Sequence, residues 1–328
     1  MSEIVTIINE FNRYLDKREK TQWAEMAVRW RQQEKTLELY IQRLADAIEA
    51  RKLAGQAVGD TAITHLESYK ELLRQVVAES AKYEGYASRV ISSEQMVYGE
   101  TGIAAAQTAI RKSVGAGIRF NMLNTGAIQD MVGVTADGSP LFDVLKKRAL
   151  APDMVAGLTD KLIEAVALGY NPRKTAAMMA DGLSQGLTKA LTIARTEQIR
   201  VYRQASVDQY IASGVVKQFQ RHAAFGERAC LSCLALDGQI QETDELIESH
   251  PNCRCFITPV IPGVSNPDRL QGADWLAKQN EETQRTILGS HYDLYQSGVP
   301  ITDMVSVKQD SVWGPTLGVK PLRDLAEE

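Results

Sequence analysis

Apolar residues recur along the first hundred positions of the chain at the spacing of an α-helix. Between residues 37 and 48 they follow one another by four, three and four residues, which lines one face of a helix; they are Leu37, Ile41, Leu44 and Ile48. The first proline is Pro140, so no earlier residue forces a helix to break. We expect long amphipathic helices here whose apolar faces pack together as core. The alternative is that one such face stays exposed and binds a partner protein.

Serine, proline and glycine mark where later helices begin and end. Ser139 followed by Pro140 predicts a helix start, because serine caps free amides and proline fits the first helical position. A helix from about residue 152 is expected to stop at Gly169, and a long helix over about 188–213 to stop at Gly214. Glycine suits both positions because it accepts the left-handed backbone that ends a helix.

The pattern changes after Gly214. Alternation around Phe219 predicts a strand, and Asp237-Gly238 is typical of a hairpin turn. A short strand is expected over 256–261, where Pro259 favours an edge position because proline cannot donate to a neighbouring strand. The sequence therefore predicts a mainly α chain with a small β-rich module, an α+β fold with a long helical N-terminal region.

Three consecutive parts follow from these patterns in a chain of 328 residues. We expect a helical N-terminal region over 1–150, a domain over 151–261 that contains a Cys/His module at 215–261, and a linker with a helical C-terminal tail over 262–328. A chain of this length commonly holds about two domains.

Composition narrows the classes of function. The formal net charge of −4 argues against a protein that coats nucleic acid, because such a protein needs a net basic face. No apolar run is long enough to span a bilayer, so no membrane partner is expected. The N-terminal residues lack the pattern of a secretory signal, and we therefore expect folding in the cytoplasm, where thiols stay reduced.

All four cysteines lie close together in the sequence, and one of the four histidines lies among them. They are Cys230, Cys233, Cys253 and Cys255, with His250. A Cys-x-x-Cys pair followed by a second cluster is typical of a tetrahedral metal site, and zinc is the metal that thiolate and imidazole ligands favour. Five candidates thus compete for four positions around a structural Zn²⁺.

Spacing alone leaves the ligand set open. Cys230 and Cys233 are joined either by His250 with Cys253, or by His250 with Cys255, or by both later cysteines. Disulfides are the alternative if the protein ends up in an extracellular particle, and buried reduced thiols are another. A catalytic metal would need an open position and a general base, for which Glu245 and Glu248 are the nearest carboxylates in sequence.

A polar run precedes the cysteines on the predicted helix over 188–213. Arg195, Thr196 and Glu197 are consecutive there, so their side chains point to different faces. We interpret them as a structural buttress that supports the Cys/His module through hydrogen bonds and ion pairs.

The order of these motifs resembles the Mu F-like phage head morphogenesis family, the minor head proteins of tailed bacteriophages. The resemblance covers about 188–261: Ala-Arg-Thr-Glu on a helix from Ala194, then Cys-x-x-Cys, Leu-Asp-Gly, and His-Pro-Asn-Cys-Arg-Cys ending at Cys255. Segments around Trp275 and Trp313 also look like the tail that often follows this domain.

The family implies a structural role rather than an enzymatic reaction. Its members are built into the phage head, where they associate with the portal protein or the major capsid protein and help head assembly, genome packaging or ejection. By resemblance, this chain would be made in the cytoplasm of the bacterial host and would end up in the virion.

Two alternatives carry different chemistry. A metal-dependent nuclease of the treble-clef type would need a general-base histidine, and the first one after the cysteines is His291. A non-enzymatic protein that contacts the packaged DNA would need local positive charge. The residues that would supply this charge are Arg195, Arg200, Arg203, Lys217 and Arg221.

Overall fold

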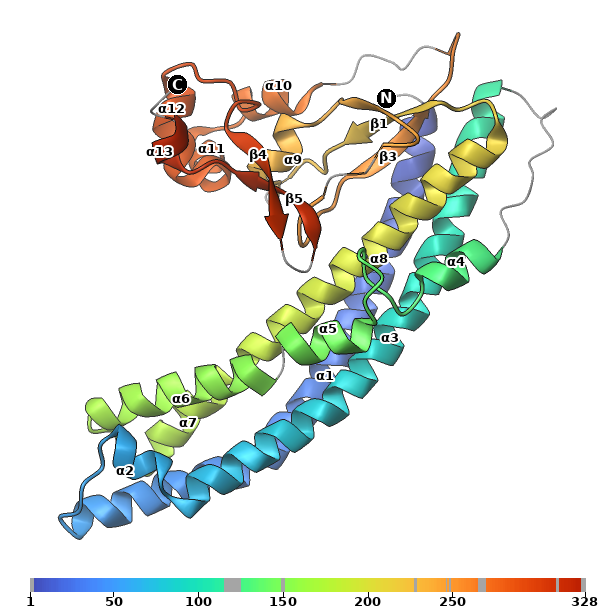
Figure 1. The fold of residues 1–328 in the computed structure, drawn as a ribbon. Helices are drawn as coiled ribbons and strands as arrows, with labels where there is room; N and C mark the ends of the chain where they lie inside the picture. Colours follow the sequence, from blue (N-terminus) through green and yellow to red (C-terminus); the bar gives the residue numbers. More distant parts are fainter. Residues whose placement is uncertain are drawn as a thin grey trace. The chain divides into compact units, whose positions relative to one another are not determined.

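The computed structural model describes residues 3–114, 125–148, 151–226, 229–245, 247, 249–264, 270–310 and 313–325 (Figure 1). Two long helices form most of the N-terminal part, α1 (Glu3–Leu53) and α3 (Glu67–Val114), with the short α2 (Asp60–Thr64) between them. The predicted fold class is confirmed, since the chain is mainly helical with a small strand-containing part.

The further elements divide into a helical middle and a mixed C-terminal part. The middle helices are α4 (Thr125–Met131), α5 (Leu141–Arg148), α6 (Ala151–Ala167), α7 (Pro172–Gly182) and α8 (Ser184–Ser213). After them come β1 (Gln218–His222), α9 (Leu231–Ala235), β2 (Ile240–Glu242) and β3 (Phe256–Val260). The C-terminal elements are α10 (Gly272–Ala277), α11 (Glu281–Leu288), the 3-10 helix η1 (Gly289–His291), α12 (Tyr292–Gln296), β4 (Val305–Asp310), β5 (Gly314–Val319) and α13 (Leu322–Leu325).

The helix ends lie where the sequence predicts them. Helix α5 begins at Leu141, directly after Pro140. Gly169 follows α6 with φ of 68° and Gly214 follows α8 with φ of 72°, the left-handed conformation that glycine adopts without a steric cost. Local sequence therefore determines these boundaries.

Packing divides the chain into two compact units. Unit 1 comprises Met1–Lys17, Ser93–Gly138 and Arg195–Glu328, and unit 2 comprises Arg18–Ser92 and Ser139–Ala194. Helices α1, α3 and α8 contribute residues to both units. Segments of the two units therefore alternate along the sequence. This is possible because a helix as long as α1, with 51 residues, is longer than one small core and contributes to two.

The core of unit 2 contains the apolar face predicted in α1. Leu37, Ile41, Leu44 and Ile48 are each at most 2% exposed, so the interpretation of this face as core is confirmed. In the same unit the rings of Trp30 and Tyr83 meet edge to face, with centroids 4.8 Å apart, and the Tyr83 hydroxyl donates to the Met26 carbonyl at 3.2 Å. In an edge-to-face contact the positive edge of one ring lies on the negative face of the other, which is an attractive arrangement.

Unit 1 holds the strands. In the three-stranded sheet β1 is central and pairs antiparallel with β2 on one side and β3 on the other. Pro259 lies in β3, so its predicted place on an edge strand is confirmed.

The predicted hairpin at Asp237-Gly238 is wrong. The residues before this turn form the helix α9, and β2 after it pairs with the distant β1. Gly238 does turn the chain, with φ of 85°. The chain therefore turns at Gly238 as predicted. The segment before this turn, which carries Cys230 and Cys233, is helical and not a strand.

The C-terminal tail contains helices as expected, in α10, α11 and α12, but it also contains the antiparallel hairpin of β4 and β5, which the sequence did not predict. It completes a core around α9: Leu231 and Leu234 pack with Leu276, Leu288 and Met304. Of the expected linker, residues 265–267 lie outside the described part of the chain. Within the described residues, no helix is long and apolar enough to cross a membrane.

Candidate metal centre

The five predicted ligand candidates come together in unit 1. Cys230 is the N-cap of α9, where its sulfur accepts a hydrogen bond from the Cys233 amide at 3.3 Å, and Cys233 lies in the first turn. His250, Cys253 and Cys255 lie on the loop between β2 and β3, hereafter the metal loop (residues 249–255). This loop reverses at Asn252, which has φ of 63°, and the Cys253 amide donates to the His250 carbonyl at 3.1 Å.

The side-chain atoms of these residues form two overlapping groups. Cys230, Cys233 and His250 have their ligand atoms within 4.8 Å of one another, as do Cys233, Cys253 and Cys255. His250 Nε2 lies 3.1 Å from Cys230 Sγ and 3.0 Å from Cys233 Sγ, and the sulfurs of Cys233 and Cys253 are 3.7 Å apart. Thiolates on one tetrahedral zinc lie roughly 3.8 Å apart, as follows from Zn–S bonds of about 2.3 Å.

A backbone contact orients the imidazole of His250. Its Nδ1 lies 2.7 Å from the carbonyl oxygen of Pro251, which can only accept, so Nδ1 carries a proton and donates it. Nε2 is then the nitrogen that faces Cys230 and Cys233. A second hydrogen bond of this kind commonly orients a histidine that binds metal.

The pKa shifts favour a thiolate at Cys230 beside a protonated imidazole at His250. Hydrogen bonds from the Cys233 thiol and from His250 lower the pKa of Cys230 to about 5. Burial lowers the pKa of His250, but Cys230 and Cys253 raise it by more, to about 10. A divalent cation bound at Nε2 would take the place of the proton that these sulfurs hold there.

Helix α8 carries the predicted buttress residues, and each occupies a different position. The Thr196 hydroxyl accepts a hydrogen bond from the Asn252 amide at 3.2 Å, so it contacts the metal loop directly. Glu197 is fully buried and accepts from Arg200 Nε at 2.8 Å, and Arg195 is 6% exposed.

Another residue of α8, Arg203, makes several hydrogen bonds to the metal loop, although the sequence suggested it only for a basic patch. Its guanidinium donates to Cys253 Sγ at 3.0 Å, to Ser249 Oγ at 2.9 Å, and to the Cys255 carbonyl. The helical spacing could have revealed it, because Arg203 follows Thr196 by two turns and shares its face.

The residues named for catalysis lie elsewhere or serve the fold. His291 Nε2 donates to the Lys320 carbonyl at 2.7 Å, and its side chain is buried. Glu245 is exposed and accepts a hydrogen bond from the Glu242 amide. Neither belongs to a metal-binding group among the described residues, and Glu248 lies outside them.

The basic patch expected for DNA contact is not on the surface as a group. Arg195, Arg203 and Arg221 are 6%, 3% and 2% exposed, and Arg200 forms an ion pair with Glu197. Of the five residues predicted for this patch, only Lys217 is exposed, so together they do not form an exposed basic surface.

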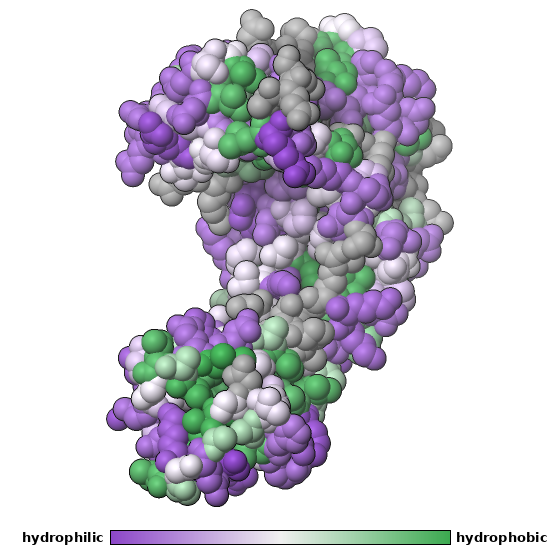
Figure 2. All heavy atoms as spheres, turned by 60° about the vertical axis from the view of Figure 1, so that its left-hand side comes forward, coloured by the Kyte–Doolittle hydropathy of each residue, from purple (hydrophilic) through white to green (hydrophobic). Residues whose placement is uncertain are grey.

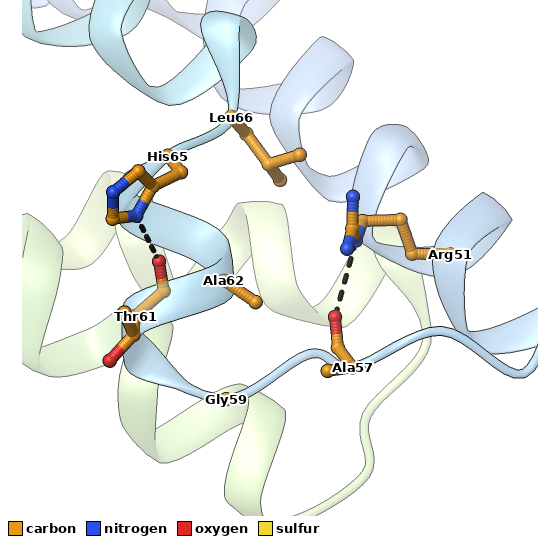
Figure 3. Close-up of a pocket in the computed structure, with 7 residues that line it drawn as sticks. All are labelled: Arg51, Ala57, Gly59, Thr61, Ala62, His65 and Leu66. Carbon is orange, nitrogen blue, oxygen red and sulfur yellow. Dashed lines mark hydrogen bonds between the residues drawn. The ribbon is translucent and has the colours of Figure 1, made fainter.

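A shallow pocket of about 480 Å³ lies in unit 2 at the connection between α1 and α2 (Figure 3). The Arg51 guanidinium donates to the Ala57 carbonyl at 3.2 Å, and His65 Nδ1 donates to the Thr61 carbonyl at 2.6 Å. Both side chains hold the backbone of this connection, so the pocket is a feature of the turn.

Comparison with known proteins identifies one family. Residues 156–258 match the model of the Phage Mu protein F like protein family. No curated protein and no solved structure matches the chain. The matched segment runs from α6 to β3 and includes Arg203 and all five candidate ligands. The resemblance predicted from the sequence is thereby confirmed over this segment, which is similar to the Phage Mu protein F like family.

Proposed function

We propose that this protein is a structural minor head protein of a tailed bacteriophage, which acts in head morphogenesis by associating with the portal. The observation that carries the proposal is the family match over 156–258, together with the buried Cys/His cluster inside it. We assign the protein no catalytic role, because the cluster is lined by thiols and an imidazole that suit a closed structural site.

The cluster would hold one structural Zn²⁺ through Cys230, Cys233, His250 and Cys253. His250 Nε2 faces both sulfurs of the first pair, which favours a set that includes the imidazole. Cys253 also interacts with His250, and its sulfur lies 3.7 Å from Cys233 Sγ. Cys255 groups with Cys233 and Cys253 but not with His250, so we leave it outside a set that contains the imidazole.

A zinc staple would have a clear structural purpose here. Strands β1, β2 and β3 contain five, three and five residues, and the metal loop between β2 and β3 has no regular structure. A tetrahedral ion would join α9 to this loop, and such cross-links supply much of the folding free energy of small modules.

Unit 2 offers the surface for association. Its exposed large apolar side chains include Leu53 (82%), Leu168 (56%) and Ile163 (38%). In Figure 2, hydrophobic residues gather in the lower part of the view, where Figure 1 places α2, α6 and α7. Apolar residues gathered on a surface commonly mark a protein interface, and we propose that this one contacts the portal.

Procapsids assembled without this chain test the proposed role. We expect a reduced yield of DNA-filled heads and of infectious particles, restored when the chain is supplied from a plasmid. Immunogold labelling should place the protein at the portal vertex. Heads of normal yield, DNA content and infectivity in its absence would refute the role in morphogenesis.

Metal analysis of Cys253→Ser and Cys255→Ser tests the ligand set. Protein purified without chelator should carry about one zinc per chain, Cys255→Ser should keep it, and Cys253→Ser should lose it. Zinc loss in both variants would support an all-thiolate site, and a folded wild-type protein free of zinc would refute the staple.

A further inference from the structure

Arg203 connects helix α8 to the metal loop through more than one group. Its Nε donates to the Cys255 carbonyl at 3.0 Å, and its Nη2 donates to the same oxygen at 2.6 Å. Nη1 donates to Ser249 Oγ at 2.9 Å, and Nη2 also donates to Cys253 Sγ at 3.0 Å. All three nitrogens of the guanidinium are therefore engaged by the two ends of one loop.

The loop held in this way carries the second half of the proposed ligand set. His250 follows Ser249 directly, and Cys253 is itself an acceptor of Arg203. The positions of the imidazole and of the Cys253 sulfur thus depend on a residue that comes from a different element. A lysine could not replace it, because a single ammonium group cannot reach three separated acceptors in fixed directions.

The positive charge of Arg203 also favours its contact with the Cys253 sulfur. The Arg203 side chain is only 3% exposed, and a buried guanidinium requires an anionic neighbour to offset its desolvation. It donates to the Cys255 carbonyl oxygen, the Ser249 hydroxyl oxygen and the Cys253 sulfur, and of these acceptors only the sulfur can carry charge. Three thiolates and one imidazole on Zn²⁺ leave one net negative charge, which favours the buried guanidinium of Arg203 beside the Cys253 sulfur.

We propose that Arg203 is a positioning residue of the metal centre. It holds the metal loop against α8 in the geometry that binds the ion, and it stabilises the negative charge on Cys253. Metal affinity and attachment of the loop to α8 are therefore one coupled equilibrium. This inference rests on the proposed zinc site.

Helix α8 supplies a matched control one turn earlier. Arg200 is also an arginine with a buried partner, and it donates to Glu197 at 2.8 Å and to the Val134 carbonyl at 2.8 Å. Among the described residues it has no hydrogen bond to the metal loop. Replacing Arg200 should disturb the helix to a similar degree without touching the ligands.

The experiment compares the wild-type chain with Arg203→Met, Arg203→Lys and Arg200→Met. Competition with a chromophoric chelator gives the zinc dissociation constant of each full-length protein. We expect Arg203→Met to bind zinc about 10- to 100-fold more weakly, the usual effect of losing a partner of a ligand. The zinc dissociation constant of Arg203→Lys should lie between those of wild type and Arg203→Met. That of Arg200→Met should stay within about twofold of wild type.

Cobalt absorption supplies a readout that a merely structural role would not change. Co²⁺ bound to thiolates has sulfur-to-metal charge-transfer bands, and loss of the hydrogen bond to Cys253 should shift them in Arg203→Lys but not in Arg200→Met. If Arg203→Met does not fold, the lysine variant decides the question alone. Unchanged zinc affinity and unchanged bands in Arg203→Lys would overturn the inference. A wild-type protein that binds neither metal would instead refute the zinc site itself.

Discussion

Several polar side chains of this protein are buried on helix α8, and each is tied to a different neighbour. Thr196 and Arg203 contact the metal loop, whereas Glu197 accepts a hydrogen bond from Arg200. The second carboxylate oxygen of Glu197, Oε1, is buried and has no hydrogen-bond partner among the described residues. A half-satisfied buried carboxylate is costly when ionised.

This cost predicts a pH dependence of stability. Burial raises the pKa of Glu197 above its ordinary value of 4.5, against the opposing effect of Arg200. The folded chain therefore binds this proton more tightly than the unfolded chain. The resulting stabilisation is fully present below pH 4.5 and is lost as the pH rises through the folded pKa. Urea unfolding of wild type and Glu197→Gln should show the wild type losing stability relative to the variant as the pH rises above about 4.5.

Glu67→Gln is the matched control for this measurement. Hydrogen bonds from Arg74 lower the pKa of the exposed Glu67, so its small effect should run in the opposite direction with pH. A difference between wild type and Glu197→Gln that does not change with pH would contradict the prediction.

At the scale of the elements, α3 and α8 approach closely in unit 1 because α3 has a glycine, Gly102, at the point of contact. A Cβ at Gly102 would collide with the Tyr202 carbonyl oxygen, and the Ser206 hydroxyl donates to the Gly102 carbonyl at 3.2 Å. The backbone of one helix thus packs on the backbone of the other. Such an approach is possible only without a side chain at the contact.

Gly102→Ala should therefore destabilise the protein by about 1–3 kcal/mol, the usual cost of inserting a carbon into a packed interior. Gly85→Ala on the same helix is the control, since its Cβ would meet only the flexible end of Arg89 at 3.7 Å. That variant should be neutral or gain up to about 1 kcal/mol from helix propensity. Thermal unfolding followed by circular dichroism distinguishes the two, and equal effects would contradict the close approach.

At the scale of the whole molecule, the C-terminal elements and the Cys/His module share one core. The Leu317 amide donates to the Ser249 carbonyl at 2.7 Å, and the rings of Phe225 and Trp275 stack with centroids 5.1 Å apart. The metal loop is therefore enclosed by β5 as well as by α8.

Metal removal should loosen this entire part of the chain. A ligand present at about 1,000 times its dissociation constant stabilises the bound form by about 4 kcal/mol. After treatment with a strong chelator, hydrogen exchange should accelerate in α9, the metal loop and β5, while the buried face of α1 around Ile41 stays protected. Unchanged exchange in the metal loop would show that no ion supports it.

Association with the head should depend on the apolar surface of unit 2. Changing Leu53, Ile163 and Leu168 together to serine should reduce incorporation into procapsids without lowering the melting temperature, because these side chains are exposed. Val307→Ser is the control, an exposed apolar residue of unit 1. Quantitative blotting of purified procapsids measures the effect, and equal incorporation of both variants would remove this surface from the proposal.

The sequence by itself determined the features that depend on local spacing. Helical periodicity predicted the buried face of α1, glycines marked the ends of α6 and α8, and the cysteine motifs indicated both a metal centre and the phage family. Each of these depends on residues a few positions apart, so backbone geometry alone suffices to interpret them.

Only the tertiary structure decided the features that join distant segments. It paired β2 with β1 instead of forming a hairpin at Asp237, added β4 and β5 to the core, and placed Arg203 against the metal loop. It also buried arginines that the sequence suggested as a DNA-binding patch. Spacing cannot reveal these contacts, because whether an arginine faces water, a carboxylate or a thiolate depends on which elements pack around it.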